Sequence, residues 1–551
     1  MWRVLALLLL FTGIGTVNAQ TASKPFILPI ASPPGATTWL FGQPYGNTVG
    51  AFLTGKNQYE AGQRLHFGLD FSTPCGTPLV AVADGQVAYV DDLSFGSAPH
   101  NLILVHPQLG LTTLYGHLLQ TPTLTPGANV KQGDVVALSG DPEGTCISRP
   151  HLHFEVRSLK YTTAYNPIPY IDANWPALTA IGAYSVPLFE QDLDYASRWI
   201  SVDDQPQVNF WGKPLNDYAA PYPDYGIGLP PANPPLTHAV NPLPERWQMR
   251  RLTYDGCCAG AWWDVGNANR LFVIDGSPDQ RAAIFEWNTE DGSLVDLVGQ
   301  APPPLLSADG TLKVERVNDQ IVITRIADGS HWTVDTQNTL PAISADNSHL
   351  LWQITHPTRD PGEDLPKTEI WISDLDGRKA RQVMVQPGAS ARWLDGSRLL
   401  ISTRKQQATT LAVDDVRDDN GFVLGSWDWM RGLSIAPGGS RLMFYLVFQD
   451  DPANDGIYAL DLQSGAQPIR LPFFGAWRWR DADTLYYLPF DPSIPYQTLH
   501  EYDLKTGEDR TLTDQPFLVA NGDWSVSPDG DQIAFWNAND RTLWLLEGAK
   551  N

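Results

Sequence analysis

A recurring turn in the second half of the chain restricts the fold more than any other feature of the sequence. Each copy precedes an apolar run, and the copies end at Gly310, Asn347, Gly396, Gly439, Asp483 and Gly530. Successive ends lie 37 to 49 residues apart, close to the ~40–45 residues of a four-stranded propeller blade. A second turn, such as Asp374-Leu-Asp-Gly377, recurs between them, as expected for hairpins within a blade. The repeat therefore predicts a β-propeller over residues 247–551.

The number of blades follows from the number of turns. The count gives six or seven blades, and seven is favoured because Met249-Arg-Arg-Leu-Thr253 offers a strand that closes the ring. The pattern resembles the TolB-like and WD-repeat-like propellers, especially where Ser527-Pro-Asp-Gly530 precedes Gln532-Ile-Ala-Phe535. Propellers of this kind serve as interaction platforms, so the resemblance implies a protein or envelope glycan as a ligand.

The chain ahead of the repeat is also predicted to be β-structure. Between residues 42 and 171, short apolar runs such as Leu102-Ile-Leu-Val105 alternate with Gly, Pro and Asp, which is typical of strands. Prolines then dominate, as in Gly228-Leu-Pro-Pro-Ala-Asn-Pro-Pro235, which indicates an extended linker. We therefore predict an all-β chain with a sheet domain at 20–172, a Pro-rich linker at 173–246 and the propeller. A small packed element near residues 195–211 is left open.

The N-terminus has the pattern of a secretory signal peptide. Arg3 precedes the apolar run Val4 to Phe11, and the small-residue end Val17-Asn18-Ala19 predicts cleavage after Ala19. The apolar run is shorter than the ~20 residues that a membrane span needs. We expect an exported protein, secreted, periplasmic or on the cell surface, without a transmembrane segment after cleavage. The net charge of −24 argues against a nucleic-acid partner, which needs clustered Lys and Arg.

Export permits disulfides, and the chain has four cysteines. Three complete pairings exist for four cysteines. A bridge between Cys75 and Cys146 is favoured because both lie in the predicted sheet domain. The adjacent Cys257 and Cys258 either form a vicinal disulfide or stay reduced.

Histidines concentrate in the sheet domain. Six of the eleven lie between His66 and His153. In a strand, residues two apart point to the same face, so His151 and His153 are expected to project together. Imidazoles and a carboxylate suit zinc, and three protein ligands leave a position open for catalysis. On these grounds alone, any three of His66, Asp70, His151 and His153 qualify as ligands, with His117 nearby.

Six ordered motifs of this region resemble the lysostaphin/LytM-type zinc endopeptidases, which cut peptide bonds in bacterial peptidoglycan. The motifs span residues 42–171 and are His66-Phe-Gly-Leu-Asp70, Cys75-Gly-Thr-Pro-Leu-Val-Ala-Val-Ala-Asp-Gly-Gln-Val87, Asn101-Leu-Ile-Leu-Val-His106, Leu111-Thr-Thr-Leu-Tyr-Gly-His-Leu118, Val130-Lys-Gln-Gly-Asp-Val-Val136 and Pro150-His-Leu-His-Phe-Glu-Val156. The resemblance implies a zinc metalloendopeptidase that hydrolyses stem peptides or cross-bridges of peptidoglycan.

The resemblance also implies a role for each residue of the site. His66, Asp70 and His153 match the zinc ligands, His151 matches the general base, and His117 matches the histidine that orients water or stabilises the oxyanion. The alternative is a non-catalytic regulator or interaction scaffold, since some relatives lose metal ligands. All five positions are present here, which weighs against that alternative.

Two segments depart from the family pattern, and two histidines are assigned no site role. Residues 47–63 and 140–149 are expected to border the cleft and to affect substrate preference. His106 ends a predicted strand and is expected to be structural, and His100 is expected to lie in a solvated loop.

Overall fold

The structure is a computed structural model that describes most of the chain. The described residues are 24–48, 50–51, 65–147, 149–181, 190–191, 199–200, 202–212, 244–254, 259–264, 266–277, 280–296, 305–356, 365–418, 420–513 and 516–548. The predicted signal peptide, the Cys257–Cys258 pair and most of residues 47–63 lie outside these ranges.

One antiparallel sheet forms the frame of the N-terminal domain. Its strands follow the order β1 (Leu40–Phe41), β2 (Leu69–Ser72), β9 (His151–Ser158), β6 (Leu111–Gly116), β5 (Leu102–His106), β4 (Gly85–Val90) and β7 (Asn129–Val130). A second pair, β3 (Pro78–Val80) and β8 (Val135–Leu138), lies beside it. The apolar core of the domain includes Leu152, Phe154 and Val156, which alternate along β9 with its polar residues.

Part of the segment predicted as linker belongs to this domain. β13 (Val208–Asn209) pairs with β10 (Thr163–Tyr165), which in turn pairs with β9. Val202 and Val208 are buried in the core of the sheet domain. The packed element therefore extends the sheet beyond the boundary predicted at residue 172. A short two-stranded ribbon, β11 (Glu190–Gln191) with β12 (Trp199–Ile200), precedes it.

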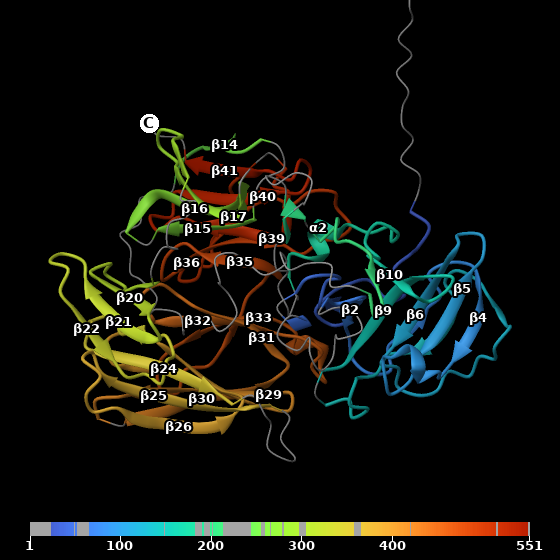
Figure 1. The fold of residues 1–551 in the computed structure, drawn as a ribbon, viewed down its shortest axis with the longest axis horizontal. Coiled ribbons are helices and arrows are strands. Elements are labelled where there is room, and N and C mark those ends of the chain that lie inside the picture. The colour runs from blue at the N-terminus through green and yellow to red at the C-terminus, as the bar shows by residue number, and fades with distance from the viewer. Residues whose placement is uncertain are drawn as a thin grey trace, which may run out of the picture.

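The second half of the described chain is a propeller of seven four-stranded antiparallel sheets, drawn in green to red beside the blue N-terminal sheet in Figure 1. Six blades are built from consecutive strands. They are β15 (Ala259–Asp264), β16 (Asn267–Ser277), β17 (Gln280–Asn288) and β18 (Leu294–Asp296); β19 (Leu305–Leu306), β20 (Leu312–Val317), β21 (Gln320–Arg325) and β22 (His331–Val334); β23 (Ala342–Ile343), β24 (His349–Thr355), β25 (Lys367–Asp374) and β26 (Arg381–Pro387); β27 (Ala389–Trp393), β28 (Arg398–Lys405), β29 (Ala408–Asp415) and β30 (Asn420–Asp428); β31 (Met430–Ile435), β32 (Arg441–Leu446), β33 (Gly456–Asp461) and β34 (Ile469–Arg470); β35 (Gly475–Trp479), β36 (Thr484–Pro489), β37 (His500–Asp503) and β38 (Asp509–Thr511).

The seventh blade closes the ring with strands from both ends of the propeller. β14 (Trp247–Arg251) pairs with β41 (Leu543–Gly548), which is followed across the sheet by β40 (Gln532–Asn537) and β39 (Val519–Val526). Seven blades and an all-β fold are therefore confirmed.

The repeated turns have a physical reason. In the last copy the Ser527 hydroxyl donates to the Asp529 carboxylate at 2.6 Å and accepts the Gln532 amide at 3.0 Å, while Gly530 adopts a φ of 75°. The turn thus satisfies its own polar groups in a conformation that favours glycine.

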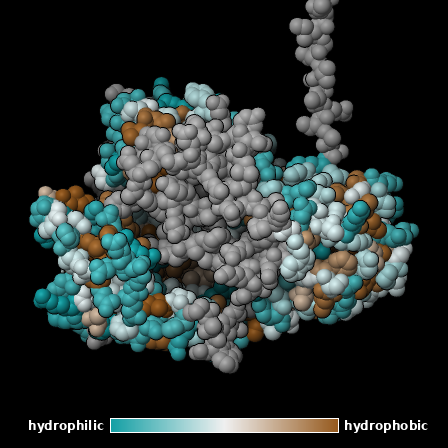
Figure 2. Space-filling model, viewed as in Figure 1, coloured by the Kyte–Doolittle hydropathy of each residue, from teal (hydrophilic) through white to brown (hydrophobic). Residues whose placement is uncertain are grey.

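The helical segments whose bounds are described are short, and the described part of the face seen in Figure 2 is mostly polar. These segments are α2 (Trp175–Leu178) and the 3-10 turns η1 (Leu93–Phe95) and η2 (Pro452–Asn454). In the part of the chain that is described, no helix has the length and apolar character to cross a membrane. The described surface in Figure 2 is mainly hydrophilic, with hydrophobic residues scattered over it.

The two domains contact each other along the β1–β2 side of the sheet, the side nearest the propeller in Figure 1. Leu40 and Ile181 are buried in an apolar cluster of propeller residues that includes Met443 and Trp477. The Arg431 guanidinium of β31 donates to the Ser72 hydroxyl at 2.7 Å. α2 lies against β39. The propeller is therefore packed directly against the sheet domain.

Candidate metal centre

Antiparallel pairing of β2 and β9 brings the predicted site residues together. The register sets Asp70 opposite His153 and Ser72 opposite His151. Because directly opposed residues share a face of a sheet, these four side chains lie on one face. His66 precedes β2 and is held by a bridge to Gly46.

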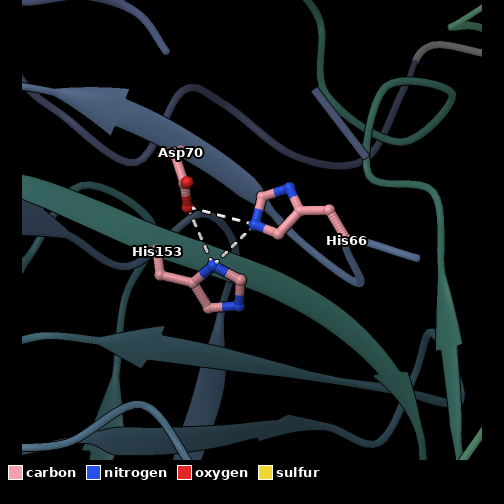
Figure 3. A group of neighbouring side chains, drawn as sticks. All are labelled: His66, Asp70 and His153. Carbon is pink, nitrogen blue, oxygen red and sulfur yellow. Dashed lines mark hydrogen bonds and ion pairs between the residues drawn. The ribbon is translucent and has the colours of Figure 1, made fainter. Parts of the chain in front are cut away.

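His66, Asp70 and His153 converge on one point, as Figure 3 shows. Oδ1 of Asp70 lies 3.3 Å from His66 Nε2 and 2.8 Å from His153 Nδ1, and the two nitrogens are 3.1 Å apart. All three residues are buried. A tetrahedral zinc ion with bonds of ~2.0 Å has ligand atoms ~3.3 Å apart, so the donor set and its spacing fit zinc.

The outer nitrogens of the two histidines are fixed by further hydrogen bonds. His66 Nδ1–H donates to the carbonyl of Pro44 at 2.8 Å, and His153 Nε2–H donates to Glu155 at 3.1 Å. The Arg157 guanidinium donates two hydrogen bonds to the same carboxylate, at 2.6 and 2.9 Å, and also donates to the Phe95 carbonyl. Such contacts orient metal-binding histidines so that the inner nitrogen points to the metal position.

Electrostatics at this centre favour a cation. Burial raises the pKa of Asp70, but the charges of His66 and His151 and two histidine hydrogen bonds outweigh it and hold the pKa well below its usual range. Burial lowers the pKa of His153, yet its hydrogen bonds to Asp70 and Glu155 dominate and raise the pKa to about 9. Without a metal, His153 therefore carries a proton that a metal ion has to displace.

His151 and His117 flank the centre as a second pair of imidazoles. Their ring centroids are 4.9 Å apart, and His151 Nε2 lies 3.7 Å from Asp70 Oδ1. His151 Nδ1–H donates to the Arg149 carbonyl at 2.7 Å, and His117 Nδ1–H donates to that of Ala98. Burial lowers both pKa values, and the charges of His151 and His153 lower that of His117 further. Both rings are thus neutral near pH 7, with Nε2 as their basic nitrogen.

All five predicted residues lie together, three in the candidate metal group and two beside it. Sequence reasoning missed Glu155 and Arg157, which continue the face of His151 and His153 along β9. The period-2 alternation of a strand would have found them, since both are polar residues at even spacing from His151. His106 and His100 are elsewhere: His106 is buried between the Asp84 carbonyl and the Thr113 hydroxyl, and His100 is half-buried against Asp91.

A disulfide joins the two loops that border His151. Cys75 and Cys146 are bonded, which confirms the predicted pairing. Cys75 follows β2, and Cys146 lies in the loop of residues 140–149 that leads into His151. The loop is braced further by the Asp141 carboxylate, which accepts the Thr145 amide at 2.8 Å, and by an Arg149–Glu143 ion pair.

Comparison with known proteins gives the same region. Residues 64–167 match the model of Peptidase family M23. The cell division protein DipM of Caulobacter vibrioides is 39% identical over 98 residues, 17% of this chain and 15% of that protein. The DD-carboxypeptidase/endopeptidase Mpg of Neisseria meningitidis is 34% identical over 95 residues, 17% and 20% of the two chains. The glycyl-glycine endopeptidase ALE-1 of Staphylococcus capitis is 27% identical over 150 residues, 27% and 39%.

The match to the family model lies within the sheet domain. The chain spans 15% to 39% of the length of these three relatives. The match to the family model confirms the resemblance that the six motifs indicated, while the activity and substrate of the whole chain remain matters for proposal.

Proposed function

We propose that this chain, in which residues 64–167 form a domain of peptidase family M23, is an exported, zinc-dependent endopeptidase that hydrolyses peptide bonds of peptidoglycan. The observation that carries the proposal is the buried group of His66, Asp70 and His153, whose donor atoms all lie within 4.8 Å of one another. The names of the relatives Mpg and ALE-1, both endopeptidases, support the reaction class.

The proposed roles follow from the contacts at the site. His66 Nε2, Asp70 Oδ1 and His153 Nδ1 would hold the ion. When bound, zinc supplies Lewis-acid chemistry, polarising a carbonyl and acidifying water. His151 is the general base, because burial keeps its imidazole neutral and its Nε2 faces Asp70. The His117 ring stands beside that of His151, and its Nε2 would orient the attacking water or, once protonated, stabilise the developing oxyanion.

The location of the protein is part of the proposal. The signal-peptide pattern of residues 1–19 and the Cys75–Cys146 disulfide both fit an oxidising compartment outside the cytoplasm. We place the enzyme in the periplasm or at the cell surface, where peptidoglycan lies.

The first test measures zinc content and endopeptidase activity of the full chain on purified peptidoglycan. His153→Ala is expected to lose both zinc and activity because it removes a ligand. His151→Ala is expected to keep zinc but lose most turnover, since removing a general base typically costs about 10²–10⁴-fold. His100→Ala is the matched control, because His100 pairs with Asp91 away from the centre, and it should keep both.

Two outcomes would contradict the proposal. Zinc-loaded wild-type protein that releases no new amino termini from several wall types would rule out the substrate. Wild-type protein that binds no zinc would instead favour a non-catalytic scaffold, with the propeller as the functional part.

A further inference from the structure

A cleft lies where the propeller meets the sheet domain. It encloses about 340 Å³ of empty space, part of it open to solvent, and its walls come from both domains. Thr73, Pro74, the Cys75–Cys146 disulfide and Pro150 form the wall of the sheet domain, and Trp429 and Phe448 form the wall of the propeller.

The cleft lies beyond the end of β2, next to residues that neighbour the candidate active site in the sequence. Ser72 pairs with His151 across the two strands, and the next step of the ladder is the hydrogen bond from the Thr73 amide to the Pro150 carbonyl. Thr73 is three residues beyond Asp70, which corresponds to ~10 Å along a strand. Strand alternation turns the Thr73 and Pro150 side chains away from the face of Asp70, but Arg431 joins that face to the cleft, because it donates to Ser72 and lies over the Phe448 ring. A peptide bound over the metal centre and extended past the end of β2 would bring a residue about three positions from the bond to be cut to the cleft.

The propeller wall is held in place by contacts with the sheet domain. The amide of Phe448 donates to the Ala36 carbonyl at 3.2 Å. Arg431 lies over the Phe448 ring at 5.4 Å and donates to the Ser72 hydroxyl, so it links the ring to the active-site face. Trp429 and Phe448 have φ values of 55° and 59°, a left-handed conformation that is costly for large side chains. Strained residues of this kind tend to gather at functional sites.

The lining determines the kind of ligand. None of the seven lining residues is charged. The one side-chain hydroxyl among them, that of Thr73, is already hydrogen-bonded to Thr38 and Thr77. A sugar ring carries hydroxyls around its edge, and the indole N–H of Trp429 is the one further side-chain donor in the lining. Most of these hydroxyls would therefore lack a side-chain partner here, which is unfavourable. An apolar side chain makes no such demand and gains by burial against the two aromatic rings of the propeller wall.

We propose that this cleft is a substrate subsite built jointly by both domains, which binds an apolar side chain of the peptide about three residues from the cleaved bond. The inference rests on the proposed peptidase function and deepens it, because it makes the propeller a wall of the substrate groove. Trp429 and Phe448 contact the substrate, and Arg431 positions Phe448.

The test compares full-chain variants on two cross-linked stem peptides prepared without sugars. One peptide spans at least three residues on each side of the cut bond, and the other is truncated so that it cannot reach the cleft. The wild type should favour the long peptide in kcat/KM, and Trp429→Ala should reduce this preference by about tenfold or more, the effect expected for losing apolar contacts in a pocket. Trp429→Phe should retain most of it.

Trp427→Ala is the matched control. Trp427 lies two residues away and packs against Phe444 of the neighbouring blade, so its loss should leave the preference for the long peptide unchanged. A second readout does not depend on activity: anisotropy of the fluorescently labelled long peptide should show weaker binding to the zinc-free Trp429→Ala and Phe448→Ala variants than to the zinc-free wild type.

The outcomes separate this inference from the proposed function. If the wild type cleaves the peptides but both aromatic variants keep its preference and binding, the subsite is wrong. If the variants lose rate only on substrates that carry the disaccharide, the cleft binds sugar and the peptide assignment is overturned. If the wild type cleaves nothing, the proposed function fails, and unchanged peptide binding by the variants would overturn the subsite separately.

Discussion

At the scale of single residues, β9 shows how one strand serves both the core and the site. Leu152, Phe154 and Val156 are fully buried in the apolar core, while His151, His153, Glu155 and Arg157 occupy the opposite face. Even the polar face is buried, so each polar group there needs a partner. Glu155 meets this need twice, because it accepts from His153 and from Arg157.

Glu155→Gln tests whether this carboxylate supports the metal centre. Glutamine keeps the shape of the side chain but removes the charge that orients His153 and neutralises Arg157. We expect zinc affinity to fall by about 10–100-fold, as is usual when the outer partner of a histidine ligand is replaced. Competition with a chelator measures the dissociation constant. Glu143→Gln is the control, since Glu143 pairs with Arg149 at the surface, and an unchanged affinity for both variants would argue against a supporting role.

The residues that the sequence could and could not predict differ in a physical way. Strand alternation alone predicts that His151 and His153 share a face, but it leaves open which three of four candidates converge. Convergence depends on the register of β2 against β9, a long-range property that sets Asp70 opposite His153. The contact of Arg431 with Ser72 had no sequence signal, because the two residues are 359 positions apart and meet only in the folded chain.

At the scale of elements, the disulfide fastens a loop that contains no strand to the end of β2. It closes a sequence separation of 71 residues, and such a constraint lowers the entropy of the unfolded chain. Because the loop leads directly into His151, whose Nδ1 is fixed by the Arg149 carbonyl, the bridge also restricts where the proposed base can lie.

Replacing both Cys75 and Cys146 by Ser should therefore lower stability and activity together. The expected loss is about 2–5 kcal/mol in the free energy of unfolding, typical for removing a native disulfide. Urea unfolding measures this loss, and peptidoglycan hydrolysis measures turnover. If stability falls while turnover per folded molecule is unchanged, the bridge supports the fold but does not position His151.

The sequence predicts strands and turns well where a local hydrogen-bonding pattern repeats, and less well where no such pattern repeats. The Ser-x-Asp turns satisfy their own hydrogen bonds, so they recur as a visible signal and mark the blades. β13 has only two residues, Val208 and Asn209, and forms because β10 offers it an edge. No local pattern marks such a strand, so the sequence predicts a linker in this segment.

At the scale of the whole molecule, the interface makes the two domains one structural unit. Leu40 is fully buried although it lies on β1, the edge strand of the sheet, because propeller residues cover it. Phe490 of the propeller packs in turn against the core of the sheet domain. Together with the Asn174 amide, which donates to the Ile494 carbonyl at 2.5 Å, these contacts hold the walls of the interdomain cleft at a fixed separation.

Leu40→Ala tests this coupling. Removing a fully buried leucine typically costs about 2–5 kcal/mol, and here the cavity would open between the domains. We expect calorimetry of the wild type to show one cooperative unfolding transition. The variant should show a transition at lower temperature, in which the propeller and the sheet domain separate. The preference for long peptides should also fall, since the cleft loses its fixed width.

Leu159→Ala provides the control for this prediction, because Leu159 is 47% exposed on the sheet domain and such surface changes usually stay within about 0.5 kcal/mol. Equal unfolding curves for Leu40→Ala and the wild type would mean that the domains do not share this interface in solution. The jointly built cleft would then lose its basis, while the metal centre, whose five residues all come from the sheet domain, would be unaffected. The coupling between domains can thus be disproved without disturbing the chemistry that it is proposed to serve.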